Sequence, residues 1–110
     1  MADDWRLSEL GFHILLALGD GPSHGYAIGH DIEERSGGRL DPTTGALYQA
    51  LGRLTADGLI AAVDGPGNVD ARRKYFALTS QGRRAAAAEA GRLDALVRAA
   101  RKRKLFPQKA

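Results

Sequence analysis

Hydrophobic side chains recur at spacings of three and four residues in several stretches of the chain, and this pattern predicts four helices. The first covers residues 7–19 and is apolar nearly all round, so we expect it to be buried on more than one side. The second covers residues 23–36, with Ser23 as its N-terminal cap. The third covers residues 43–56, and the fourth runs from residue 79 to about residue 103.

Between the third and fourth helices, residues 59–63 and 72–78 have the character of two strands, joined by a glycine-rich polar loop at 64–71. A two-stranded hairpin is not stable alone, so it must pack against the helices. This order predicts a winged helix-turn-helix, a mainly α fold with a β-hairpin wing. We expect residues 1–78 to form this DNA-binding part and residues 79–110 a C-terminal dimerisation helix with a basic tail, in one compact domain.

The third helix is the stretch around which we expect the function to be organised. Its apolar stripe is formed by Leu47, Ala50, Leu51 and Leu54, and its opposite face carries Thr44, Tyr48, Gln49 and Arg53. Thr43 or Thr44 can cap its start, and Gly58 can end it in a left-handed turn. Such a polar face suits insertion into a groove of DNA, and the alternative is an ordinary surface helix. Tyr48 either faces the groove or packs back against the protein.

The fourth helix carries an apolar stripe that the winged-helix core does not need, because three helices and a hairpin already close that core. A second copy of the chain is the simplest supplier of a covering surface. We therefore predict a homodimer through apolar residues of the last and first helices: Ala86, Ala90, Leu93, Leu96, Val97, Ala100, Leu10 and Ile14.

Charge is distributed unevenly along the chain, although the net charge is only +3. Residues 1–64 hold four basic against ten acidic side chains, a balance of −6, and residues 65–110 hold twelve against three, a balance of +9. The basic second half indicates an anionic partner. The alternative is that the two halves attract each other within a dimer, and both can hold together.

Other chemistry finds little support in the sequence. The chain has no cysteine, and its three histidines lack metal-ligand spacing, so we expect no metal, no cofactor and no enzymatic activity. We expect His24 to be a structural imidazole, hydrogen-bonded near a helix start. No run of about 18 apolar residues exists, and the first residues lack the order of a signal peptide. We therefore expect a cytoplasmic protein without a membrane segment.

Three motifs in sequence order resemble those of the PadR family of bacterial transcriptional regulators. The first runs from Ile14 to Ile28 and contains Gly-Pro-Ser-His-Gly-Tyr. The second contains Gly45-Ala-Leu-Tyr48 and Gly58-Leu-Ile. The third is Arg72-Arg-Lys-Tyr-Phe-Ala-Leu-Thr79 followed by Gly82. The three together are specific, and they cover about residues 8–83. The chain length resembles the small subclass of the family, with one C-terminal helix.

The resemblance implies a dimeric winged-helix protein that binds double-stranded DNA, usually as a repressor released by a small effector or a change of state. It places the following residues at the DNA: Tyr26, Thr43, Thr44, Gly45, Tyr48, Gln49, Arg53, Asn68, Arg72, Arg73 and Lys74. Two features differ from the family pattern. Arg53 is the only base on the third helix, and the last helix has no aromatic residue, which argues against a drug pore built on aromatic stacking.

We therefore expect a dimeric repressor that binds a palindromic operator. Two alternatives stay open. One is a protein-interaction module in which the winged helix is only a scaffold, as the sparse charge on the third helix allows. The other adds a small lipophilic effector, bound at the dimer interface between the apolar first helix and the alanine-rich last helix.

Overall fold

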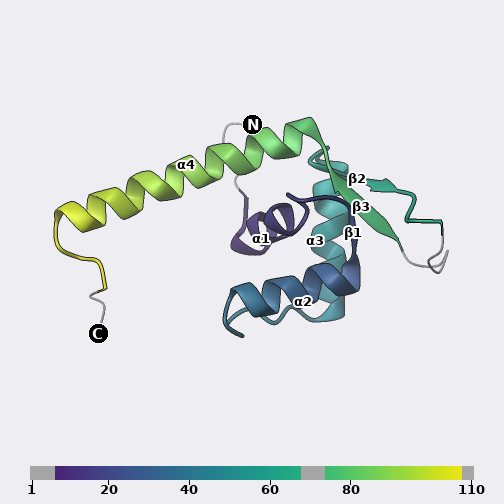
Figure 1. Ribbon diagram of the computed structural model, residues 1–110, viewed down its shortest axis with the longest axis horizontal. Coiled ribbons are helices and arrows are strands. Elements are labelled where there is room, and N and C mark those ends of the chain that lie inside the picture. The colour runs from purple at the N-terminus through teal and green to yellow at the C-terminus, as the bar shows by residue number, and fades with distance from the viewer. Residues whose placement is uncertain (1–6, 68–73, 108–110) are drawn as a thin grey trace.

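The computed structural model describes residues 7–67 and 74–107. In these parts the elements are α1 (Glu9–Ala17), β1 (Ser23–His24), α2 (Gly25–Arg35), α3 (Thr44–Ala56), β2 (Ile60–Val63), β3 (Tyr75–Leu78) and α4 (Ser80–Lys102). Figure 1 shows α1, α2 and α3 gathered beside the small sheet, while α4 extends away from them on the side opposite the strands. This is a winged helix-turn-helix with a long C-terminal helix, which confirms the predicted fold class.

Side-chain caps fix where the helices begin. The hydroxyls of Ser8, Thr43 and Thr79 accept hydrogen bonds from the backbone N–H groups of Gly11, Ala46 and Gly82, which would otherwise lack partners. The prediction that Ser23 caps α2 is wrong. Ser23 lies in β1, and the Nδ1 atom of His24 accepts from the Ala27 N–H at 3.3 Å instead. His24 is thus a hydrogen-bonded imidazole at a helix start, as predicted.

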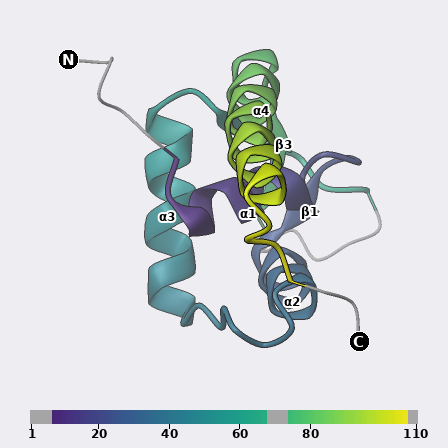
Figure 2. The same cartoon turned by 90° about the vertical axis from the view of Figure 1, so that its left-hand side faces the viewer.

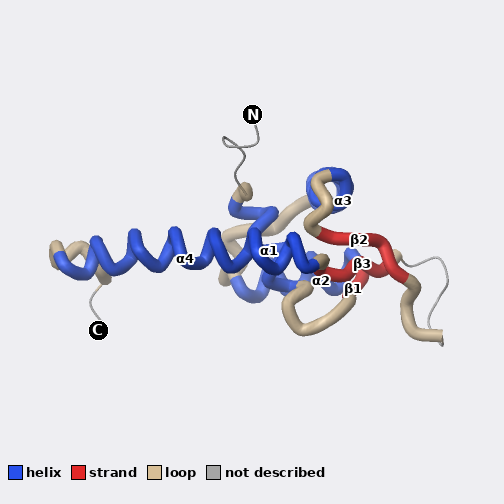
Figure 3. The backbone as a smooth tube through the Cα atoms, turned by 90° about the horizontal axis from the view of Figure 1, so that it is seen from above, coloured by secondary structure: helices blue, strands red, loops and turns tan. Residues whose placement is uncertain are grey.

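The sheet has three strands rather than the predicted two. Its order is β1-β3-β2, and both pairs are antiparallel. In the added pair Ser23 lies opposite Phe76, and His24 lies opposite Tyr75. The β1 strand therefore joins the start of α2 directly to the wing strand β3, and Figure 3 shows the three strands side by side at the end of the body opposite α4.

One hydrophobic core holds the three helices and the sheet together. Leu51 of α3 and Ile28 of α2 are almost fully buried in it. The complete core consists of Ile14, Leu15, Leu18, Ile28, Ile32, Leu47, Leu51, Leu54, Leu59, Ile60 and Phe76. The apolar stripe predicted for α3 thus faces inward, which leaves the polar face of this helix at the surface.

A tight junction connects the end of α3 to the start of α4. Gly58 has a φ of +79°, which is favourable for glycine, and it ends α3 in the predicted left-handed turn. The Thr79 hydroxyl lies 2.7 Å from the carbonyl oxygen of Gly58, to which it donates. The Thr79 N–H donates to the carbonyl oxygen of Leu59. These hydrogen bonds to Gly58 and Leu59, which directly follow α3, fix where α4 begins relative to α3.

Within the described parts of the chain, no helix is both long and apolar enough to cross a membrane.

Candidate nucleic-acid interface

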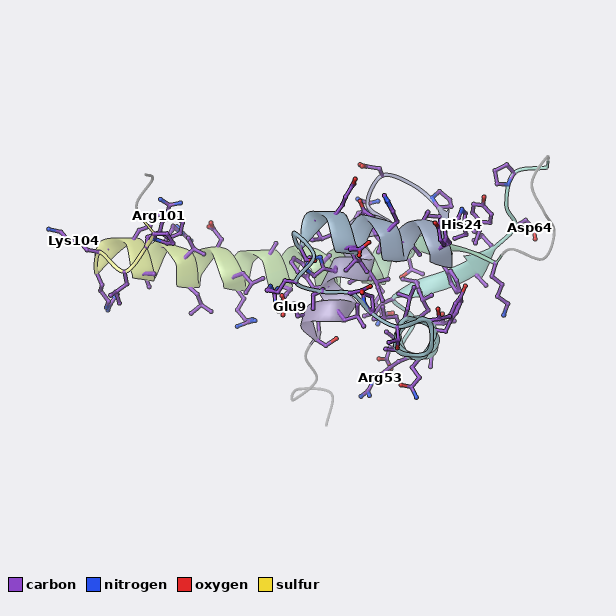
Figure 4. The ribbon with its side chains drawn as sticks, turned by 90° about the horizontal axis from the view of Figure 1, so that it is seen from below. Glu9, His24, Arg53, Asp64, Arg101 and Lys104 are labelled. Carbon is purple, nitrogen blue, oxygen red and sulfur yellow. The ribbon has the colours of Figure 1, made fainter. Side chains whose placement is uncertain are left out.

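The outer face of α3 is an exposed polar surface. Figure 2 shows α3 at the outer edge of the molecule, and in Figure 4 the Arg53 side chain points away from the body. Thr43, Thr44, Gly45, Gln49 and Arg53 are all exposed, and Tyr48 is 48% exposed. This face can therefore approach a macromolecule without rearrangement of the core.

A cleft of about 280 Å³ between α2 and α3 brings together three of the residues assigned to DNA, namely Tyr26, Thr44 and Tyr48. Tyr26 lies in the first turn of α2 and is 77% exposed. An exposed tyrosine combines an aromatic surface with a hydroxyl that can donate to a phosphate oxygen. The start of α3, with its partial positive charge, opens beside this cleft and favours an anion there.

Tyr48 packs back against α2, so its outward role is limited. A β-carbon built on Gly25 would lie 2.5 Å from the Tyr48 hydroxyl and 2.9 Å from the ring carbon that carries it. Gly25, the second glycine of the Gly-Pro-Ser-His-Gly-Tyr motif, therefore leaves the space that the Tyr48 side chain of α3 occupies. The two motifs are coupled by this contact, which fixes the spacing of α2 and α3.

We expect Gly25→Ala to lower the free energy of unfolding by about 1–3 kcal/mol, because the added methyl overlaps the Tyr48 ring system. Urea unfolding followed by circular dichroism measures the change. Tyr48→Phe in the same chain removes the nearest atom and should recover part of the loss. Gly29→Ala is the matched control on α2, since its β-carbon would make only an ordinary 3.4 Å contact. Equal stability of the Gly25 and Gly29 variants would show that the contact has no structural effect.

His24 links this cleft to the wing strand. Its ring stacks with that of Tyr26 at 6.5 Å between centroids and meets the Tyr75 ring edge-on at 5.3 Å. The sequence predicted a hydrogen-bonded imidazole at this position but not its edge-on contact with Tyr75, because that contact depends on the pairing of β1 with β3. His24 therefore positions an α2 residue assigned to DNA relative to the strand that carries the wing.

The structure describes only part of the predicted wing. Asn68, Arg72 and Arg73, which were assigned to DNA, lie outside the described residues. Lys74 is exposed directly before β3, and Asp64 follows β2. Figure 1 shows that β2 and β3 extend away from the body on the side opposite α4, as a wing requires.

The electrostatics of this surface are mixed. Arg53 is the only base on α3, while Glu33 and Asp41 line the α2–α3 cleft beside Tyr26 and Thr44. Carboxylates at that position oppose close contact with phosphates on one side of the cleft. The sequence gives no sign that these two acids lie at the interface, because only the fold places the end of α2 next to the start of α3. Among the described residues, no group of three His, Asp or Glu side chains could hold a metal ion.

The residues assigned to a dimer interface fall into two groups. Ile14 is 0% exposed in the core of its own protomer, so its assignment to the interface is wrong. Leu10 and Ala86 are half-buried against the same core. In contrast, Leu96 is 56% exposed and Val97 38%, and Leu16 on α1 is 42% exposed. The remaining three stripe positions are Ala90, which is exposed, and Leu93 and Ala100, which are half-buried.

Comparison with known proteins decides the family. A sequence model of the PadR-like family of transcriptional regulators matches residues 14–88, which include β1, α2, α3, the sheet and the start of α4. The chain belongs to the PadR-like family. Members of this family are transcriptional regulators rather than enzymes, as the sequence analysis expected.

The chain is also similar to individual proteins. An uncharacterised 37.1 kDa protein of a Streptomyces fradiae transposon is 45% identical over 78 residues, which are 71% of this chain and 21% of that protein. The chain thus spans about a fifth of the length of this curated relative. A transcriptional regulator from Clostridium thermocellum has a similar structure, with a TM-score of 0.71, 25% identity, and coverage of 84% of this chain and 87% of the other.

Bacillus subtilis PadR, solved in complex with operator DNA, shares the fold with a TM-score of 0.66 and 24% identity. The match covers 76% of this chain and 47% of that protein. The PadR fold is therefore present here, together with the long helix α4 that follows the sheet.

Proposed function

We propose that this PadR-like protein is a homodimeric transcriptional repressor that binds a palindromic site in double-stranded DNA. The observation that carries the proposal is the exposed polar face of α3, capped by Thr43 and held on the core by Leu47, Leu51 and Leu54. Residues 1–78 would contact DNA and residues 79–110 would join the two protomers. Because its target is chromosomal DNA, the proposal includes a cytoplasmic location.

Each α3 would enter a major groove of the operator. Gln49 is suited to pair with an adenine edge, and Arg53 to meet a guanine or a phosphate. Tyr26, Lys74 and the start of α3 would contact backbone phosphates, which fix position but carry no sequence information. In a two-fold dimer the half-sites would lie about one helical turn apart.

These roles predict different effects for two substitutions. Lys74→Ala should weaken binding to all DNA sequences to a similar extent. It should also reduce by about 1 the slope of the logarithm of the binding constant against the logarithm of the salt concentration. Gln49→Ala should instead cost about 1–3 kcal/mol at the preferred base and relax the preference there. Competitive gel-shift titrations against a set of single-base operator variants measure both.

Arg98→Ala, on the half of α4 that extends away from the body, is the control for loss of a cation. Indistinguishable specificity profiles for the Lys74 and Gln49 variants would refute the assigned roles.

The exposed Leu16 on α1 and Leu96 on α4 favour an additional function, the binding of a small lipophilic effector between these helices in the dimer. A thermal-shift screen of aromatic and lipophilic compounds tests this part. A compound that raises the melting temperature of the native protein but not that of a Leu16→Gln variant supports the location.

A further inference from the structure

The cleft between α2 and α3 carries negative charge that nothing in the described parts of the chain balances. Among the Lys, Arg, Asp and Glu residues described, only Glu33 and Asp41 line this cleft. Both are exposed, and neither side chain forms an ion pair or a hydrogen bond with a described residue. By contrast, Asp31 on the same helix pairs with Arg35. The cleft therefore holds two uncompensated carboxylates.

Both carboxylates lie close to groups that we assign to the DNA backbone. Glu33 follows Tyr26 by seven residues on α2, which is about 10 Å along the helix axis. Asp41 precedes Thr43, the N-terminal cap of α3, by two residues. An exposed charge acts over about 10 Å in 0.1 M salt. A phosphate in contact with Tyr26 or with the start of α3 would therefore be repelled.

Helix electrostatics account for only one of these two acids. A carboxylate before the start of a helix offsets the partial positive charge of that end, so Asp41 favours α3. The same partial charge would otherwise attract a phosphate, so Asp41 opposes DNA there. Glu33 lies in the last turn of α2, where the helix end is partially negative and an acid is unfavourable. Glu33 therefore needs an explanation other than the stability of its helix.

We propose that Glu33 and Asp41 determine specificity by repelling backbone phosphates from the α2–α3 cleft. This inference rests on the proposed function, in which α3 reads base edges in a major groove. Sequence-independent binding comes almost entirely from the attraction between cations and phosphates. α3 supplies one cation, Arg53, and the cleft supplies two opposing carboxylates. This surface therefore binds DNA weakly unless contacts with bases add to the affinity.

The repulsion acts more strongly against a wrong sequence than against the operator. On the operator, contacts between α3 and the base edges fix the register, and the phosphates stay outside the cleft. On another duplex nothing fixes the register, so the backbone settles where charge favours it. Without the two carboxylates that position is the cleft, because the start of α3 attracts an anion. Repulsion that acts mainly on the wrong partner is a source of specificity.

Replacement of both acids by their amides tests this inference, because Gln and Asn keep the size of the side chains. A dimer that carries Glu33→Gln and Asp41→Asn lacks four carboxylates. In 50 mM NaCl we expect its affinity for a scrambled duplex to rise about tenfold, and its affinity for the site upstream of its own gene about twofold, measured by fluorescence anisotropy. Each single substitution should give about a threefold rise on the scrambled duplex. The tenfold rise should shrink to about twofold in 300 mM NaCl, because salt screens exposed charges.

Glu34→Gln is the matched control, because Glu34 is also exposed on α2 but does not line the cleft. It should leave both affinities unchanged. Thermal unfolding followed by circular dichroism shows that each variant is folded. A double variant that binds the scrambled duplex no more tightly than the Glu34→Gln protein overturns the inference and leaves the proposed function standing. An equal rise on both duplexes does the same, whereas a native protein that binds neither duplex removes the proposed function as well.

Discussion

Replacement of Gly82 by alanine is expected to lower the free energy of unfolding by more than about 3 kcal/mol, because the added methyl group would make a closer contact here than at any other glycine compared in the described parts of the chain. A β-carbon at this position would overlap the carbonyl oxygen of Leu59 and lie 2.9 Å from its carbonyl carbon. Backbone atoms cannot rotate away as a side chain can. The same carbonyl accepts the Thr79 N–H, so relief of the overlap requires the junction between α3 and α4 to open.

Urea unfolding of the purified protein measures this change. Gly91→Ala is the matched control, because it lies on the same helix and its β-carbon would meet nothing within 4 Å. The free energy of unfolding of the Gly91→Ala variant should rise by about 0.5–1 kcal/mol, because alanine has a better helix propensity than glycine. If Gly82→Ala were as stable as Gly91→Ala, the described packing of α4 on the β2 connection would be incorrect.

Leu96→Glu is expected to convert the protein to a monomer and to reduce operator affinity at least about 100-fold. Leu96 is the most exposed large apolar side chain of α4, at 56%, and the proposed dimer covers it. A carboxylate placed in a covered apolar contact loses its hydration without gaining a partner, which costs several kcal/mol. Loss of the dimer then removes one of the two recognition helices from each complex.

Sedimentation velocity and a gel shift on the same samples follow the two effects together. Ala88→Glu serves as the control. Ala88 is exposed and lies nine residues before Val97, which places it on the side of α4 opposite Val97, so its replacement should leave the dimer and the affinity for DNA intact. A Leu96→Glu protein that remains a dimer would place the interface elsewhere. A monomer with native affinity would show that one protomer is enough for binding.

The helical part of the fold could be predicted from local patterns in the sequence. The stripe of Leu47, Leu51 and Leu54 fixes the inward face of α3, and Thr43 and Gly58 fix its two ends. These signals act between residues three or four positions apart, so they can be read along the chain. The exposure of Gln49 and Arg53 follows from the same periodicity.

Contacts between distant segments could not be predicted in this way. The two-residue strand Ser23–His24 is too short for alternation to show, and it exists because β3 supplies its hydrogen bonds. Ile14 was assigned to an interface because α1 is apolar nearly all round. Only the packed structure distinguishes its buried side from the side that carries Leu16. The contact between Gly25 and Tyr48 likewise joins two motifs that the sequence shows separately.

Glu33 at the end of α2 illustrates the same limit at the candidate site. Glu33 reads as part of a solvated helix face in the sequence, yet the fold places it in the cleft beside Tyr26 and Thr44. No local pattern signals this position, because it depends on how the connection after α2 returns to α3. Charge at the interface therefore has to be read from the structure.

Binding of the native protein to the DNA upstream of its own gene, titrated against salt and mapped by footprinting, tests the central claim most directly. We predict protection of two half-sites about one helical turn apart, with an affinity that falls steeply as the salt concentration rises. The same experiment is repeated with a protein that carries both Gln49→Ala and Arg53→Ala. An unchanged footprint and an unchanged affinity would show that binding does not depend on the outward face of α3, and would contradict the account.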